Sequence, residues 1–178
     1  DPVEVHTCGA WSQGPTLLQA LAILEGSNVA TLEPGSTAYY HTMAEAIKLA
    51  LADREAYLGD PDFVDVPVDT LISRAYGAER AQLIDANLAA PGMPSPGSIP
   101  GYHPYHSPVI RDRGLPKLPA DTSIVCVIDQ QGNAICATPS DTSWDTPVVP
   151  GTGLAISSRG DQSRAVRGHP SVMAPGKR

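Results

Sequence analysis

The fold is decided by residues 122–137, which read TSIVCVIDQQGNAICA. Apolar residues run without a break from Ile124 to Ile128, which predicts a β-strand buried on both faces. The next five residues are polar and contain Gly132, a composition typical of a turn, and a second short apolar run follows them. We therefore predict a β-hairpin whose first strand begins at or next to Thr122.

Residues 1–89 carry the apolar periodicity of helices. The pair Gly14-Pro15 opens the first predicted helix, because proline at the first helical position sacrifices no hydrogen bond. This helix is expected to end at Glu25, with Gly26 directly behind it. Its apolar stripe is predicted to consist of Leu17, Leu18, Leu21 and Leu24.

A longer helix is predicted from about Thr37 to Leu58, with Ser36 as its N-cap. An ion pair between Asp53 and Arg54 is expected to fix the end of this helix. Apolar residues recur at helical spacing at Met43, Ile47, Ala50, Leu51 and Leu58. After a turn at residues 59–62, two short helices are expected near residues 68–75 and 78–88.

The segment 90–121 is a proline-rich connector, with eight prolines between Pro91 and Pro119. Such a stretch cannot form a helix or a central strand, and alone it would indicate an exposed linker that proteases can reach. The chain therefore divides into three parts. We expect a helical segment over 1–89, the connector over 90–121 and a segment of β-structure and loops over 122–178.

Composition narrows the class of protein. The chain has 178 residues, about one domain's worth, and 42 % hydrophobic residues, enough for a core. Its net charge of −7 argues against nucleic acid as a partner, and no apolar run is long enough to span a membrane. The chain begins at Asp1 rather than methionine and reads as a piece of something larger. We therefore leave the compartment open.

The three cysteines, Cys8, Cys126 and Cys136, match no zinc-binding spacing. Because Cys126 and Cys136 lie in apolar runs, buried thiols are expected, with a cross-strand disulfide as the alternative. We expect no metal and no cofactor. His103 and His106 could form a metal site. Because both lie in a proline-rich loop, we expect them to be surface side chains instead. The remaining histidines, His6, His41 and His169, have no partner at ligand spacing.

Thr122 is a candidate nucleophile only if the chain is cut in front of it. A threonine hydroxyl is a poor nucleophile at neutral pH and needs a base. A threonine at a chain's N-terminus carries its own base, the free α-amine, which titrates near pH ~8. Such a residue needs a strand that begins at it and a cleavable segment before it, and the hairpin and the connector meet both needs. Composition alone would leave Thr122 as an ordinary β-former.

The stretch 121–134 resembles the start of the small subunit of gamma-glutamyltransferases, in which a threonine and an apolar strand are followed by Val-Asp-x-x-Gly-Asn-Ala. The stretches VVPGTG (148–153) and PGKR (175–178) fall in the same order as in that family. MAEA (43–46) and ADREAYLGDPDFV (52–64) are similar to the end of the family's large subunit. The resemblance covers nearly the whole chain. It implies an α+β chain that forms part of the αββα layered fold of N-terminal nucleophile (Ntn) hydrolases.

The resemblance also implies an activity. The enzyme would cut its own bond between Asp121 and Thr122, and Thr122 would then cleave γ-glutamyl amides of the glutathione type through an acyl-enzyme, passing the acyl group to water or an amino acceptor. The family's oxyanion donors are backbone amides of a Gly-Gly pair beyond Arg178, so this chain alone is expected to be inactive and to need the remainder of the same enzyme. The resemblance implies a periplasmic or extracellular location, and the gamma-glutamyltransferase-like branch of the family allows a cytoplasmic one.

The family's site residues carry over with changes. Ser140 falls where a second threonine supports the nucleophile. Thr142 replaces an Asn that contacts the substrate in the family, and Arg159 replaces a Gln. Gln162 replaces an Asp that binds the substrate's α-amine, so a charge-assisted contact is lost. The opening Thr122-Ser123 replaces Thr-Thr and Asp121 points to the like-branch. A related acylase, such as a cephalosporin acylase, and an uncleaved, inactive scaffold fragment therefore remain as alternatives.

Overall fold

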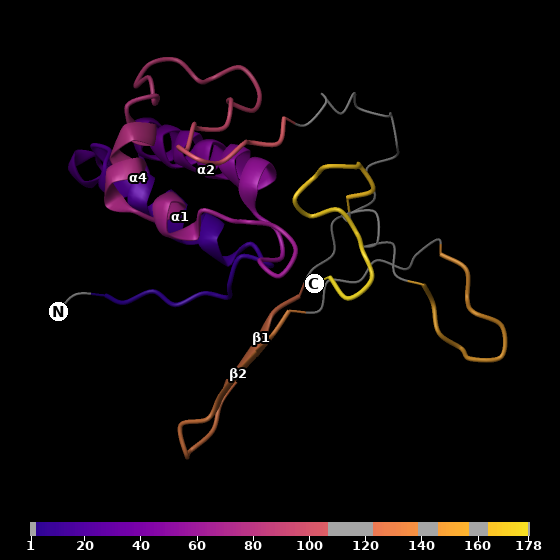
Figure 1. Cartoon of the computed structure of the whole chain (residues 1–178). Coiled ribbons are helices and arrows are strands. Elements are labelled where there is room, and N and C mark those ends of the chain that lie inside the picture. Colours follow the sequence, from indigo (N-terminus) through magenta and orange to yellow (C-terminus); the bar gives the residue numbers. More distant parts are fainter. Residues whose placement is uncertain (1–2, 107–122, 139–145, 157–163, 178) are drawn as a thin grey trace. The chain divides into compact units, whose positions relative to one another are not determined.

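The computed structural model describes residues 3–106, 123–138, 146–156 and 164–177. They belong to two compact units, the first made of residues 1–109 together with 165–178 and the second of residues 110–164. The first unit holds all the helices of the described residues, and the second holds the two strands (Figure 1). None of the described helices is long and apolar enough to cross a membrane. The chain is α+β with a helical first part, as expected.

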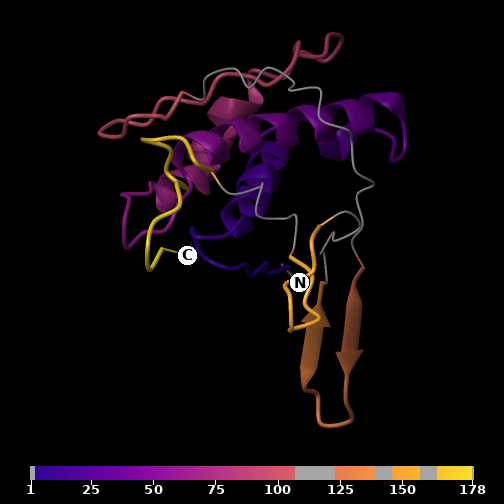
Figure 2. The same ribbon diagram turned by 90° about the vertical axis from the view of Figure 1, so that its right-hand side faces the viewer.

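Helix α1 (Gly14–Glu25) has the predicted bounds within one residue, but it buries a different face. Its buried residues include Thr16, Gln19, Ala20 and Ile23, whereas Leu17 and Leu21 of the predicted stripe are 52 % and 42 % exposed. The predicted apolar stripe was therefore wrong at Leu17 and Leu21, whereas Leu24 is partly buried and packs against the core. Helices α2 and α4 both pack against α1 (Figures 1 and 2).

Helix α2 (Thr37–Tyr57) begins at its predicted cap, since the Ser36 hydroxyl accepts a hydrogen bond of 3.1 Å from the Tyr39 amide. Helices α1 and α2 share a core cluster in which Ala46 and Ala50 are fully buried beside Ile23 and Leu49. Ile47, which we had placed on the apolar stripe, is 45 % exposed, so that part of the prediction was wrong.

Two short helices follow, as expected, but the first ends earlier than the predicted 68–75 and the second begins and ends earlier than the predicted 78–88. They are α3 (Val68–Leu71) and α4 (Arg74–Ala81), and a 3₁₀ turn, η1 (Val29–Thr31), precedes α2. The Ser73 hydroxyl accepts a hydrogen bond from the Tyr76 amide and so caps α4, which starts that helix four residues before the predicted point. The described part of the connector, residues 90–106, contains no helix or strand, in agreement with its prolines.

The second unit contains the predicted hairpin, made of β1 (Val125–Ile128) and β2 (Ala134–Ala137) in antiparallel pairing. Gly132 has a φ of 84° in the turn, a left-handed conformation that glycine adopts without strain. Every residue of both strands is exposed in this chain, so the predicted burial on both faces was wrong, as was that of the thiols on the strands. An apolar sequence indicates that a strand is suited to a buried sheet. The layers that would cover this hairpin are not among the described residues.

Candidate functional site

All the predicted site residues lie outside the described part of the chain. These are Asp121, Thr122, Ser140, Thr142, Arg159 and Gln162. The structure describes their framework instead: the hairpin that follows Thr122 in sequence, the connector that precedes it, and the segment 164–177. The geometry of these three parts determines what can be argued about the site.

The register of the hairpin is fixed by its turn. The amide of Asp129 donates to the carbonyl of Asn133 at 3.0 Å, which makes this a hydrogen-bonded pair. Because such pairs alternate along an antiparallel ladder, Val125 and Ala137 form another, and Cys126 and Cys136 form a non-hydrogen-bonded pair, in which side chains lie closer together. One strand leads back toward Thr122 and the other leads on toward Ser140, which lie beyond the described ends of the hairpin.

The turn is held by the side chain of Asp129. Its Oδ1 accepts hydrogen bonds of 2.9 Å from the amides of Gln131 and Asn133, and its Oδ2 accepts one of 2.7 Å from the Asn133 side chain. The bond from the Asn133 side chain is the main reason why the pKa of Asp129 is held below its ordinary value. Such Asx-type bonding specifies the turn and therefore the register of both strands.

The start of the connector is anchored on a buried carboxylate, Asp53 of α2, which is fully buried. The amide of Gly97 donates to its Oδ1 at 2.6 Å, and Gln19 and Tyr76 donate to its Oδ2 at 2.5 and 3.1 Å. Arg80 Nε lies 3.1 Å from the same Oδ2, an ion-pair contact without the angle of a hydrogen bond. Burial raises the pKa of Asp53, opposed most strongly by the Arg80 charge.

Two further bonds tie the connector to the helices. Arg80 donates to the carbonyl of Ser95 at 3.0 Å, and the Tyr57 hydroxyl donates to the carbonyl of Gly97 at 2.6 Å. The predicted ion pair between Asp53 and Arg54 was wrong, because Arg54 pairs with Glu55 at 3.6 Å. Consecutive residues on a helix point about 100° apart, so Asp53 faces the core while its neighbour faces outward.

The segment 164–177 returns to the same end of α2. His169, only 4 % exposed, has its Nε2 3.1 Å from Glu55 Oε1, and its Nδ1 accepts a hydrogen bond of 2.9 Å from the Ser171 amide. An Nδ1 that accepts carries no proton, so the Nε2–H donates to Glu55. The Ser171 hydroxyl donates to the carbonyl of Leu58 at 2.8 Å. Sequence reasoning missed this contact, since its partners are 114 residues apart.

Gly59 completes the docking of this segment. A Cβ added at Gly59 would collide with the carbonyl oxygen of Pro170. The same oxygen accepts a hydrogen bond of 2.6 Å from Lys177, whose ammonium also lies 5.8 Å from the centre of the Phe63 ring. The absence of a side chain at position 59 therefore lets the segment approach the backbone that follows α2.

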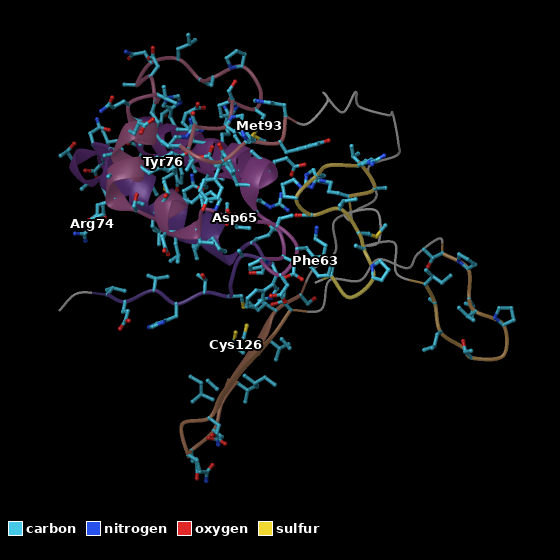
Figure 3. All side chains as sticks on the ribbon, in the orientation of Figure 1. Phe63, Asp65, Arg74, Tyr76, Met93 and Cys126 are labelled. Atoms are coloured by element: carbon cyan, nitrogen blue, oxygen red, sulfur yellow. The ribbon has the colours of Figure 1, made fainter. Side chains whose placement is uncertain are left out.

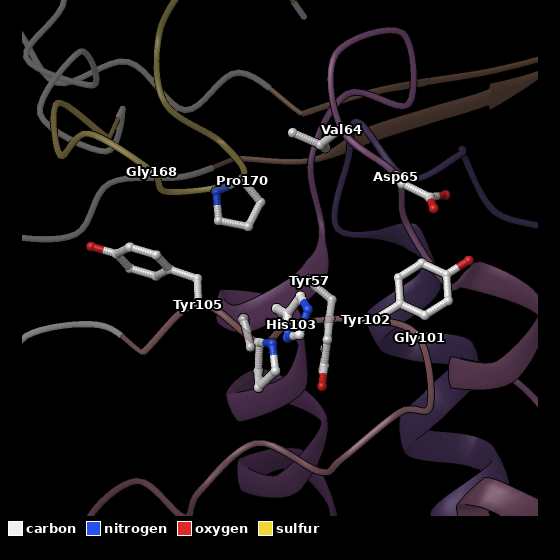
Figure 4. Close-up of a pocket in the computed structure, with 11 residues that line it drawn as sticks. Tyr57, Val64, Asp65, Gly101, Tyr102, His103, Tyr105, Gly168 and Pro170 are labelled. Carbon is white, nitrogen blue, oxygen red and sulfur yellow. The ribbon is translucent and has the colours of Figure 1, made fainter.

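A pocket of about 430 Å³ lies where the connector and this segment meet the end of α2 (Figure 4). Connector residues around Tyr102 and His103 form one wall and Gly168 and Pro170 form another. His103 is exposed, as its place in the loop indicated. Among the described residues, no group of three or more His, Cys, Asp or Glu side chains could hold a metal ion. The pocket is bounded by one segment that precedes Thr122 in the sequence and one that follows it.

The chain can now be compared with known proteins. Residues 1–178 match the family model of gamma-glutamyltranspeptidase. The chain belongs to the gamma-glutamyltranspeptidase family. As a member of the gamma-glutamyltranspeptidase family, it is 36 % identical over 164 residues to the glutathione hydrolase proenzyme of Escherichia coli strain K12, covering 90 % of this chain and 26 % of that protein. It is also 36 % identical over 169 residues to the acylase ACY 1 proenzyme of Pseudomonas sp. strain SE83, covering 94 % and 27 %. The chain thus spans about a quarter of the length of these gamma-glutamyltranspeptidase-family relatives.

The same relationship is seen in three dimensions. The chain superposes on the crystal structure of cephalosporin acylase from Bacillus halodurans with a TM-score of 0.64 and 27 % identity, covering 93 % of this chain and 26 % of that one. The expected α+β class, as part of an Ntn-hydrolase fold, is confirmed by this superposition together with the family match.

Proposed function

We propose that this chain carries the processing site and the nucleophile of a self-cleaving amidohydrolase or acyltransferase of the gamma-glutamyltranspeptidase family. Cleavage of the bond between Asp121 and Thr122 frees the amine of Thr122. The freed threonine then takes the acyl group from a γ-glutamyl amide of the glutathione type and passes it to water or to an amino acceptor. The remainder of the same enzyme completes the site.

The observation that carries the proposal is the register of the hairpin. Val125 is paired with Ala137 at the last pair of the described ladder, and Thr122 and Ser140 each stand three residues beyond this pair in the sequence. A hydroxyl at position 140, as far beyond this pair in the sequence as Thr122, suits the supporting role that we assign to Ser140.

The proposed chemistry needs no cofactor. In the processing step, the hydroxyl oxygen of Thr122 attacks the carbonyl carbon of Asp121, the C–N bond breaks as the amine takes up a proton, and an ester forms. Water hydrolyses this ester and leaves a carboxylate on Asp121. In the mature enzyme, the free α-amine accepts the hydroxyl proton as Thr122 attacks the substrate, because its pKa of about 8 lies close to the working pH.

The segments on both sides of the proposed cut are held together in the structure. The His169–Glu55 and Ser171–Leu58 contacts join the part after Thr122 to the part before it. The anchored connector at Gly97 keeps the upstream side attached to the helices. Noncovalent docking of this kind supports a two-chain product that remains one protein.

A second candidate is an acylase for another acyl amide. This candidate is supported because the chain is as similar to an acylase proenzyme as to a glutathione hydrolase proenzyme, 36 % identical in each case. The Gln at position 162 also supports it, because a neutral amide binds an α-ammonium group less strongly than the family's carboxylate does. We place Thr142, Arg159 and Gln162 in the substrate-binding part of the site in either case.

The test is mass spectrometry of the full-length protein and of its Thr122→Ala and Thr122→Ser variants. We expect the unaltered protein to yield a new N-terminus reading Thr-Ser-Ile-Val, the Ser variant to yield the corresponding cut more slowly, and the Ala variant to stay intact and inactive. Thr70→Ala, the same substitution at an exposed threonine, serves as the matched control.

An intact chain in the unaltered protein, with activity toward amides, would overturn the proposal. If the protein is cleaved before Thr122, activity toward two anilide substrates separates the two candidates. The γ-glutamyl anilide should be hydrolysed faster than a glutaryl anilide, which lacks the α-amine, if the first candidate is correct, and more slowly if the acylase candidate is correct.

A further inference from the structure

The segment 164–177 is docked on the end of α2 through the ring of His169, which has a partner on each nitrogen. Nε2–H donates to Glu55 Oε1 at 3.1 Å, and Nδ1 accepts a hydrogen bond of 2.9 Å from the Ser171 amide. The Tyr105 ring of the connector packs edge-to-face on the imidazole, with ring centres 4.8 Å apart. These residues all belong to the first compact unit and contact one another, so the arrangement involves no open surface.

The bond from the Ser171 amide forms only while Nδ1 of His169 carries a lone pair. Protonation of an imidazole places a hydrogen on each ring nitrogen, so both become donors. The Ser171 N–H would then point at a second N–H, and a buried amide that loses its acceptor costs about 1–3 kcal/mol. Protonation is therefore compatible with the bond to Glu55 and incompatible with the turn formed by residues 169–171.

The charges near the ring oppose one another. Glu55 and the C-terminal end of α2 favour a cationic ring, but Arg54 lies 3.6 Å from the second oxygen of Glu55 and already provides a positive charge there. At 4 % exposure, the ring also lacks the hydration that a cation needs. The segment has no acidic residue, so a charge on His169 would join three other cations. The other charged side chains and histidines of the elements packed here are Asp60, Asp62 and Asp65 of the loop after α2, His103 and His106 of the connector, and Arg164, Arg167 and Lys177 of the segment.

We infer that His169 is a proton-sensitive latch, whose neutral ring holds the turn 169–171 on the end of α2 and whose protonation releases it. A histidine in water has a pKa of about 6.5, so the released form takes up one proton more than the docked form below this pH. Docking is therefore fully present above about pH 6.5 and weakens by up to tenfold for each pH unit below it. In a chain cut before Thr122, the same proton would loosen a contact between the two products.

Other contacts of the segment contain no group that gains a proton near neutral pH. The Ser171 hydroxyl donates to the carbonyl of Leu58 at 2.8 Å. The ammonium of Lys177 lies 5.8 Å from the centre of the Phe63 ring, which is labelled in Figure 3. These contacts keep the segment near α2 when the ring is protonated, so the release is local and reversible.

The test is amide hydrogen exchange of the full-length protein between pH 5 and pH 8, resolved to single amides by mass spectrometry. The protection factor compares each amide with an unstructured peptide at the same pH, which removes the chemical pH dependence of exchange. We expect the protection factors of Ser171 and Val172 to fall on the order of tenfold or more from pH 7 to pH 5. Those of Leu49 and Ala50, buried in α2, should stay constant and show that the unit remains folded.

His169→Asn separates the proton from the hydrogen bond. The asparagine oxygen can accept the Ser171 amide as Nδ1 does, but it takes up no proton, so protection at Ser171 should no longer change with pH. His103→Asn and His106→Asn, at the two histidines of the connector, are the matched controls and should keep the full pH dependence.

The inference is overturned if protection at Ser171 in the unaltered protein is constant from pH 8 to pH 5, or if it rises in acid because the cationic ring docks more tightly. A pH dependence that persists in His169→Asn, or disappears in either control, would also overturn it. If His169→Asn fails to dock at any pH, the unaltered protein and the two controls still decide. The measurement reports docking rather than activity, so its outcome is independent of cleavage before Thr122.

Discussion

His169 Nε2 lies 3.1 Å from Glu55 Oε1, although 114 residues of chain, including Thr122, separate the two residues. The pair joins a helix from the first part of the sequence to a segment from the last part. The Ser171 amide fixes the ring from its other side by donating to Nδ1. On the proposed cleavage, a contact within one chain becomes a contact between two.

Replacing Glu55 by Gln should loosen the docked segment. The substitution removes the charge that the histidine N–H donates to, and weakening a partly buried hydrogen bond to a charged group costs about 1–3 kcal/mol. We expect amide hydrogen exchange around Ser171 and Val172 to speed up by roughly tenfold, since 1.4 kcal/mol corresponds to a factor of ten. His169→Gln should act in the same direction.

The matched control is Glu25→Gln, which breaks the ion pair between Glu25 and Arg74, an exposed pair with a separation of 3.1 Å. An exposed pair contributes about 0–1 kcal/mol, so the control should leave exchange in the segment unchanged. Equal effects of Glu25→Gln and Glu55→Gln on the segment would contradict a specific role for the buried pair.

Replacing Asp53 by Ala should be among the most destabilising single changes in the helical unit. The variant leaves Arg80, itself 4 % exposed, as an uncompensated buried charge, which costs about 3–5 kcal/mol. Denaturant unfolding measures this loss. Asp65→Ala, at an exposed position, should change stability by no more than about 0.5 kcal/mol.

The hairpin turn should depend on pH through Asp129. Its folded-state pKa is lowered, so the stability that this carboxylate contributes is present above its unfolded pKa of about 4 and is lost as the pH falls through the folded pKa. The amide resonances of Gln131 and Asn133 should therefore shift in acid and report a midpoint below about pH 4. Asp129→Asn should abolish this titration, and a persistent midpoint in that variant would exclude Asp129 as its source.

Substrate preference should respond to position 162. Under the proposed function, Gln162→Asp supplies the carboxylate that would pair with the α-amine of a γ-glutamyl group. A charge-assisted bond contributes about 1.5–3 kcal/mol, so kcat/KM for the γ-glutamyl anilide should rise roughly tenfold or more relative to the glutaryl anilide. Gln130→Asp adds the same charge in the hairpin turn and should leave the ratio unchanged.

Local signals predicted the elements of this fold well. The Gly14-Pro15 start, the Ser36 cap and the glycine turn at Gly132 each act within a few residues, and the structure has the corresponding helix starts and turn. The faces of the helices were predicted less well. Periodicity ranks residues by hydrophobicity, but here one of the buried positions on α1 is taken by Gln19, because its amide donates to Asp53 of α2.

Long-range partners were beyond prediction from one sequence. Nothing in the residues around His169 indicates Glu55, since the contact arises only after the chain has folded back over more than a hundred residues. The Asp53–Arg80 pair is of the same kind, because it depends on how α2 and α4 pack on α1. The assignment of Thr122 as nucleophile stays a prediction, since it rests on the sequence and on the hairpin that begins three residues after it.

Gly59 gives experimental control over the order of events during maturation. Because a single methyl group at this position collides with the carbonyl of Pro170, Gly59→Ala should yield a protein whose helices are formed while the late segment remains undocked. If such a protein still cuts itself before Thr122, docking follows processing. If it remains a single chain, docking must precede cleavage, and activation of the enzyme then depends on the absence of a side chain at Gly59.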